Sequence, residues 1–80
     1  MTPYQTMLKA YTEGKKVRLV FTNGRVEPGT RLLDMYDEFD FEPSDEYIEQ
    51  CPEIDPEFCK RNRILSADYD DVQSADIIAE

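Results

Sequence analysis

The chain has 80 residues, which is enough for one domain built around one hydrophobic core. Its 18 Asp and Glu residues outnumber nine Lys and Arg, and the formal net charge of −9 disfavours binding to a phosphate backbone. The absence of histidine excludes Ser-His-Asp and Cys-His nucleophile systems and imidazole metal sites.

The two cysteines, Cys51 and Cys59, are too few for a structural zinc site or a multiply bridged secreted scaffold. We expect a reduced pair, with a Cys51–Cys59 disulfide as the alternative. The residues after Met1 resemble neither the basic nor the apolar part of a signal peptide, and no apolar run exceeds three residues. We therefore expect a soluble, cytoplasmic protein with no membrane partner.

The N-terminal residues carry the signals of a short helix. Thr2 and Gln5 form a capping-box pattern, Pro3 suits the first helical position, and Gly14 suits a left-handed residue at the helix end. These signals predict a helix over about residues 3–12. Four apolar residues spaced for one helical face are expected to point at the core: Tyr4, Met7, Leu8 and Tyr11.

Residues 16–36 have the pattern of a β-hairpin. Residues 16–22 are rich in β-branched and aromatic side chains, which favours a strand. Asn23-Gly24 then favours a type I′ turn, in which both central residues have positive φ. Pro28-Gly29 indicates a bulge or bend at a sheet edge, followed by a further strand or a curved continuation to residue 36.

Charge is distributed unevenly along the chain. Residues 1–33 hold six basic and two acidic side chains, whereas residues 34–57 hold eleven acidic and none basic. Aromatic and branched residues run through the acids, so we expect an acidic insertion over about residues 37–57 that is at least partly folded. Ser44-Asp45-Glu46 and Asp55-Pro56-Glu57 each resemble a helix start.

Residues 63–79 are expected to supply closing strands separated by a turn near residues 69–72. The expected fold is therefore a single, mainly β (α+β) domain: an N-terminal helix followed by a small, SH3/Sm-like curled antiparallel sheet or barrel with the acidic insertion. Closure would remove most strand edges. The expected core contains Tyr4, Met7, Leu8, Tyr11, Val17, Leu19, Phe21, Leu32, Ile64, Leu65 and Ile77.

The hairpin of residues 16–26, followed by Gly29, resembles the opening of Sm-like and SH3-like small barrels. The leading helix and the closing stretch Tyr69-Asp70-Asp71-Val72-Gln73-Ser74 resemble the Rho-binding antiterminator family, Rof, and also WYL ligand-sensing domains. The Trp-Tyr-Leu signature of the WYL family is absent. The resemblance to Rof implies an acidic barrel that binds the transcription terminator Rho and blocks its RNA site.

Carboxylates on a folded scaffold can imitate phosphates, and interleaved aromatic side chains can anchor a protein contact. We therefore hypothesise a non-enzymatic inhibitor that binds the basic, nucleic-acid-binding surface of a partner protein. It would be Rof-like or a nucleic-acid mimic such as an anti-CRISPR or anti-restriction protein. The alternative is that the acids only keep the surface solvated while the aromatics fill the core. The candidate contact residues are Asp34, Tyr36, Asp37, Glu38, Phe39, Asp40, Phe41, Glu42, Asp45, Glu46, Tyr47 and Glu49.

A second hypothesis is an Sm-like barrel that binds RNA or DNA, with Phe21 available for stacking on bases. Its basic residues would be Lys15, Lys16, Arg18, Arg25, Arg31, Lys60, Arg61 and Arg63. They equally suit ordinary solvated positions or partners for neighbouring acids.

Two further possibilities concern chemistry at the acids and cysteines. A divalent cation would need oxygen ligands, and five carboxylates are close in sequence, but their spacing is not that of an EF-hand loop: Asp34, Asp37, Glu38, Asp40 and Glu42. Paired carboxylates or Cys59 could support catalysis, yet a chain this short has little room for a cleft that perturbs them. We expect no enzymatic activity, no cofactor and no metal site.

Overall fold

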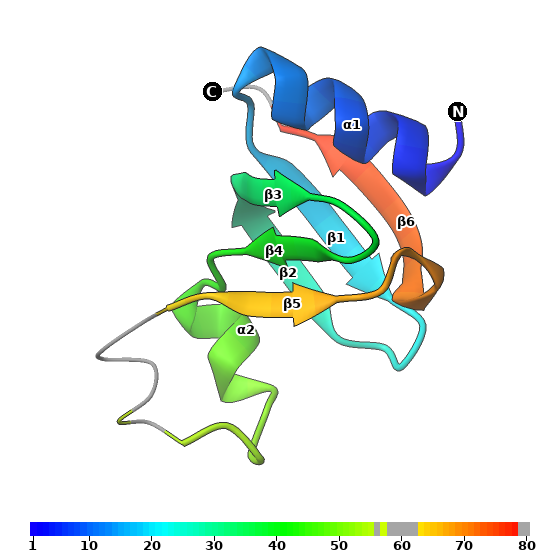
Figure 1. Ribbon diagram of the computed structural model, residues 1–80. Helices are drawn as coiled ribbons and strands as arrows, with labels where there is room; N and C mark the ends of the chain where they lie inside the picture. The colour runs from blue at the N-terminus through cyan, green and yellow to red at the C-terminus, as the bar shows by residue number, and fades with distance from the viewer. Residues whose placement is uncertain (56, 58–62, 79–80) are drawn as a thin grey trace.

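The computed structural model describes residues 1–55, 57 and 63–78 (Figure 1). Within these residues, neither helix is both long and apolar enough to pass through a membrane. The elements, in chain order, are α1 (Pro3–Glu13), β1 (Val17–Phe21), β2 (Val26–Thr30), β3 (Leu32–Met35), β4 (Phe39–Phe41), α2 (Asp45–Glu49), β5 (Leu65–Ala67), the 3₁₀ turn η1 (Tyr69–Asp71) and β6 (Val72–Ile77).

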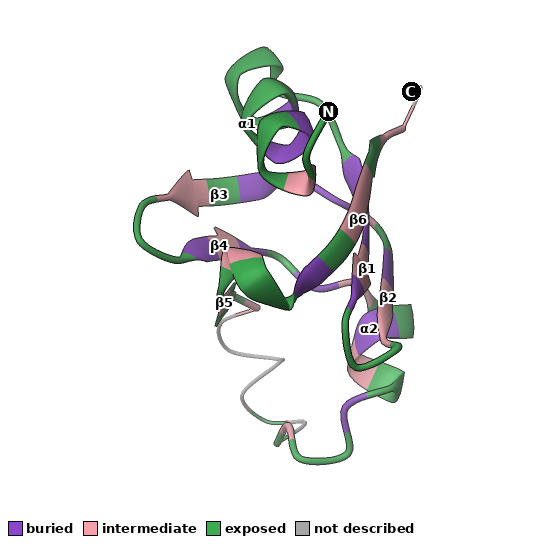
Figure 2. Cartoon of the chain, turned by 90° about the vertical axis from the view of Figure 1, so that its right-hand side faces the viewer, coloured by how far each residue is buried: buried purple, intermediate pink, exposed green. Residues whose placement is uncertain are grey.

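The strands form two three-stranded antiparallel sheets, so the molecule is a mixed α+β protein. The first sheet has the order β2-β1-β6 and the second has the order β3-β4-β5. Figure 2 shows the two sheets as separate layers, with α1 and α2 at opposite ends of the molecule. The expectation of a closed barrel is wrong, because the chain changes sheets at Arg31 and no strand pairing joins the described strands across the two sheets.

Helix α1 begins and ends where the sequence predicts. The Thr2 hydroxyl accepts a hydrogen bond from the Gln5 amide at 3.2 Å, and the Gln5 side chain accepts one from the Thr2 amide at 3.0 Å. Gly14 ends the helix at φ 66°, a left-handed conformation that costs glycine little. The capping box is therefore confirmed.

The face that α1 buries is narrower than predicted. Thr6, Met7 and Ala10 are buried against β6 and β3, because the small Thr6 and Ala10 side chains let the helix approach the sheets closely. Three residues of the expected apolar stripe remain exposed, so their assignment to the core is wrong: Tyr4, Leu8 and Tyr11.

The first hairpin is confirmed, but its turn differs from the prediction. The Gly24 amide donates to the Phe21 carbonyl at 3.0 Å, and the Phe21 amide donates to the Arg25 carbonyl at 2.9 Å. Gly24 has φ 91° and Asn23 does not have positive φ, so the turn is not type I′. These features are those of a three-residue loop that ends in a left-handed glycine. Asn23 instead stabilises the loop by accepting a hydrogen bond from the Arg25 amide at 3.0 Å.

Strand β2 contains the predicted irregularity at Pro28-Gly29. The register against β1 shifts between Val17, which pairs with Thr30, and Leu19, which pairs with Glu27. One extra residue of β2 is therefore accommodated as a bulge, and β2 lies at an edge of the first sheet, where proline is tolerated.

The core lies between the two sheets and is rich in aromatic rings. Phe21 of the first sheet packs on Phe41 of the second at a centroid distance of 5.9 Å and on Tyr47 of α2 at 5.4 Å. The predicted core residues Met7, Val17, Leu19, Phe21 and Leu32 are buried, and Leu65 and Ile77 pack against them while partly buried. Ile64 is exposed, so its prediction as core is wrong; it lies just outside β5 and beside Leu65, whose side chain packs on the core.

Residues 37–57 are not an appendage to the fold. They contribute β4 and α2, and the predicted helix start at Ser44 is confirmed, because the Ser44 hydroxyl accepts a hydrogen bond from the Tyr47 amide at 3.2 Å. The second predicted helix start, at Pro56, lies outside the described residues. Cys51 is buried as a free thiol, and Cys59, the partner in the alternative disulfide, also lies outside the described residues.

Candidate functional site

Strand β4 places acidic and aromatic side chains on opposite faces of the second sheet. Phe39 and Phe41 are at most 1% exposed and form part of the core. Glu38 and Glu42 are exposed and Asp40 is half-buried, at the positions that alternate with the two phenylalanines. Because successive strand residues point to opposite faces, Asp40 lies on the outer face, and Glu38 and Glu42 lie just beyond the two ends of the strand.

The neighbouring strands extend this acidic row. Asp34 of β3 pairs directly with Asp40 of β4, and Asp40 pairs with Ser66 of β5. The Ser66 hydroxyl donates a hydrogen bond to Asp40 Oδ1 at 2.5 Å. Two like charges directly opposite each other repel, so this pair weakens the sheet on which it stands. We call Asp34, Asp37, Glu38 and Asp40 the acidic face.

Among the described residues, the acidic face has no basic ion-pair partner. In residues 1–55, 57 and 63–78, no Lys or Arg forms an ion pair with any of its four carboxylates. The ion pairs in this part of the chain involve other acids: Lys15 with Glu13, Arg25 with Glu53 and Arg63 with Asp45.

The turn that carries Asp37 and Glu38 is held in place by Tyr69 of η1. The Tyr69 hydroxyl donates to the Tyr36 carbonyl at 2.7 Å, and the Tyr36 amide donates to the Glu38 carbonyl at 2.9 Å. The Tyr69 ring contacts Tyr4 edge-on at 4.9 Å between centroids and packs on Phe39 at 5.5 Å. Burial, and then the neighbouring Tyr4 and Asp37, raise the pKa of Tyr69. The sequence predicts Tyr69 in a turn and in the stretch that resembles Rof, and it does not indicate these contacts.

Of the four predicted aromatic anchors, only Tyr36 remains available to a partner. It is 80% exposed beside the acidic face. Phe39, Phe41 and Tyr47 fill the core, so their prediction as contact residues is wrong. The alternation of β4 points both phenylalanines inward, and Tyr47 covers Phe21 and Phe41 from α2.

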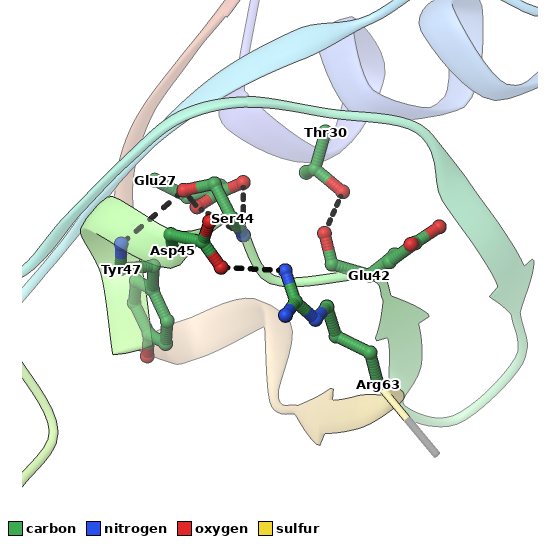
Figure 3. A network of polar contacts seen from close by, with 7 residues as sticks. All are labelled: Glu27, Thr30, Glu42, Ser44, Asp45, Tyr47 and Arg63. Carbon is green, nitrogen blue, oxygen red and sulfur yellow. Dashed lines mark hydrogen bonds and ion pairs between the residues drawn. The ribbon is translucent and has the colours of Figure 1, made fainter. Parts of the chain in front are cut away.

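The remaining predicted acids lie elsewhere. Asp45, Glu46 and Glu49 belong to α2, which packs against β2 of the first sheet and therefore lies outside the acidic face on β3 and β4. Asp45 Oδ1 accepts a hydrogen bond from Arg63 at 2.7 Å (Figure 3). The predicted contact set is therefore divided between two places, and only its β3–β4 part forms a continuous row.

A buried carboxylate that the sequence did not single out holds α2 in position. Glu27 of β2 is 0% exposed, and its carboxylate accepts hydrogen bonds from the Ser44 amide at 3.0 Å and the Ser44 hydroxyl at 2.7 Å (Figure 3). Burial raises the pKa of Glu27, although both hydrogen bonds from Ser44 oppose the shift. The hydrogen bonds satisfy the carboxylate, as burial requires.

The basic hairpin residues are largely committed to contacts within the chain. Arg25 donates to both oxygens of Glu53 and to Cys51 Sγ at 3.2 Å. The hydrogen bonds with Glu53 raise the pKa of Arg25 and lower the pKa of Glu53. Arg18 faces Asp76 across β1 and β6. Phe21, expected as a stacking residue, is buried in the core, so that assignment is wrong.

The carboxylates show no arrangement suited to a metal ion within the described parts of the chain. Across residues 1–55, 57 and 63–78, no three Cys, Asp or Glu side chains come together as a set of potential ligands. The carboxylates of the acidic face lie side by side on the surface and do not surround a common point, so they are arranged for contact with another surface rather than for coordination of an ion.

Comparison with protein-family models, curated proteins and solved structures finds no match to this chain. The functional argument therefore depends on the arrangement of its own residues.

Proposed function

We propose that this chain is a non-enzymatic inhibitor or regulator whose acidic face binds a basic surface on a nucleic-acid-binding protein. The observation that carries the proposal is the facing pair Asp34 and Asp40, with Glu38 just before β4 and no basic partner among the described residues. A repulsive pair of this kind weakens its own sheet, and a cationic partner would relieve the repulsion.

The geometry supports a contact with one extended surface. Strand pairing fixes the backbone at Asp34 and Asp40, and Tyr69 holds the turn that carries Asp37 and Glu38, so a partner need not order this backbone on binding. Tyr36 adds an exposed aromatic ring beside the row, and such rings commonly anchor protein interfaces and stack on arginine. With a net charge of −9, the chain would also be steered toward a basic surface before contact.

The resemblance to Rof suggests the first partner to test. That resemblance rests on the leading helix and the closing stretch Tyr69-Asp70-Asp71-Val72-Gln73-Ser74; the chain has the helix as α1, but its two sheets do not close into the barrel that the resemblance implies. Rho, the transcription terminator bound by that family, is therefore the candidate basic partner, and its RNA site is the surface that the acidic face would cover.

The test uses variants that change charge equally at two places. Asp34→Asn combined with Asp40→Asn removes two charges from the acidic face, and the amide oxygens can still accept the Ser66 hydrogen bond. Glu13→Gln combined with Asp76→Asn removes two charges elsewhere. We expect the first double variant to weaken partner binding about tenfold at low salt and the second to leave it nearly unchanged.

Two measurements separate the general proposal from its Rof-like form. Titration of purified Rho, with displacement of single-stranded RNA as the readout, tests the Rof-like form directly. Capture from bacterial lysate at low and high salt, with both double variants, tests the general form. A basic partner other than Rho that is lost only with the acidic-face variant supports the general form alone. The absence of any such partner, or direct RNA binding by this chain at low salt, contradicts the proposal.

A further inference from the structure

A basic hollow lies on a different part of the molecule from the acidic face. Its volume is about 380 Å³, within the range of small-molecule sites. Three of its lining residues are basic and come from distant parts of the chain: Lys16 precedes β1, Arg31 joins β2 to β3, and Arg63 precedes β5. Only folding brings these three cations together.

The charge of the hollow is opposite to that of the whole chain. One acid, Glu42, lines it together with the three basic residues, which gives the lining a formal charge of +2 in a chain of −9. In the described parts of the chain Lys16 forms no ion pair, and Arg63 is paired with Asp45 at 2.7 Å. The Lys16 backbone is fixed, because its carbonyl accepts a hydrogen bond from the Ile78 amide at 2.9 Å.

The uncharged polar groups of the hollow already have partners. The Thr30 hydroxyl donates to the Glu42 carbonyl at 2.7 Å, and the Ser44 amide and hydroxyl both donate to Glu27 (Figure 3). Recognition of a ligand would therefore depend on the charged side chains rather than on the backbone at Ser44.

We propose that this hollow binds a small phosphomonoester that carries hydroxyl groups. A phosphate monoester has about −1.5 to −2 charges near neutral pH, which matches the charge of the lining. Arginine and lysine are the usual donors to phosphate oxygens. The Glu42 carboxylate accepts hydrogen bonds only, so it suits a ligand hydroxyl and repels a polyanion such as RNA.

The inference is independent of the proposed partner contact, because it concerns Lys16, Arg31 and Arg63 rather than the acidic face. Calorimetric titration at low salt, in a buffer free of phosphate, compares ribose 5-phosphate with ribose and with inorganic phosphate. We expect ribose 5-phosphate to bind, ribose not to bind, and inorganic phosphate to bind more weakly because it lacks the hydroxyl contacts to Glu42.

Matched variants locate the site. Lys16→Gln and, separately, Arg31→Gln should each weaken ribose 5-phosphate binding about tenfold, the usual effect of losing a charge-assisted hydrogen bond. Lys9→Gln makes the same charge change on exposed α1 and should alter the affinity less than about twofold. Thermal unfolding of each variant confirms that it remains folded, and the two hollow variants give independent measurements.

The Glu42→Gln variant tests the role assigned to the acid. It should strengthen binding of inorganic phosphate by removing a repulsive charge, and it should reduce the preference for ribose 5-phosphate over phosphate. The proposal is overturned if neither phosphate compound binds, if ribose binds as tightly as its phosphate, or if Lys9→Gln weakens binding as much as Lys16→Gln.

Discussion

The carboxylate of Glu27 on β2 accepts hydrogen bonds from both the amide and the hydroxyl of Ser44, the residue that caps α2. This contact joins residues that are 17 positions apart and attaches the start of α2 to the first sheet. Strand β4, by contrast, lies in the second sheet between β3 and β5. The acids of α2 and those of β4 therefore lie on different elements, held by different sheets.

Replacing Glu27 should show how much this contact contributes to stability. Glu27→Met keeps a similar length but removes both acceptors, so the partly buried Ser44 donors lose their partners. We expect the free energy of unfolding to fall by about 1–3 kcal/mol. Glu27→Gln keeps an acceptor oxygen and should lose less. Urea unfolding followed by circular dichroism measures both, and equal stability of Glu27→Met and the parent chain would contradict the assigned role.

The pH dependence of stability should carry the signature of the same carboxylate. The pKa of Glu27 is raised in the folded state above its ordinary value of 4.5, so the folded chain holds this proton more tightly than the unfolded chain. The contribution of Glu27 to stability is therefore largest below pH 4.5 and is lost as pH rises through its folded-state pKa. The stability of Glu27→Gln relative to the parent should therefore rise across that interval, since the variant has no proton to lose. A relative stability that falls as pH rises would show that the pKa is lowered instead.

Removing the Tyr69 hydroxyl should loosen the turn that carries Asp37 and Glu38. Tyr69→Phe keeps the ring contacts with Tyr4 and Phe39 but loses the hydrogen bond to the Tyr36 carbonyl. We expect a loss of about 0.5–1.5 kcal/mol in unfolding free energy. Hydrogen exchange should be faster at the Tyr36 amide, which donates to Glu38 within this turn. Unchanged exchange at that amide would mean that the turn is held by other contacts.

Neutralising Asp34 should stabilise the fold while it weakens the proposed partner contact. Asp34→Asn removes the repulsion across to Asp40, and we expect a gain of about 0.2–1 kcal/mol that shrinks as salt is added. Asp76→Asn is the matched control, because Asp76 faces Arg18 rather than another acid. This variant should be slightly less stable than the parent chain. If both variants change stability in the same direction, the cross-strand repulsion is not significant.

Local sequence signals determined the elements whose hydrogen bonds close within a few residues. Thr2, Gln5 and Gly14 fix the ends of α1, and Ser44 fixes the start of α2. Asn23-Gly24 located the first hairpin, although the turn type depended on how the two strands pair. Such features are predictable because the interacting groups are neighbours in the chain.

Tertiary structure alone decided what faces the core, what faces solvent, and which charges meet. The two sheets bury Phe39, Phe41 and Tyr47, which the sequence offered equally as anchors or as core. Pairing of β3 with β4 sets Asp34 opposite Asp40, and folding brings Arg63 to Asp45, 18 positions away in sequence. The physical reason is that burial and electrostatic energy depend on distances in space, and these distances join residues that are far apart in sequence.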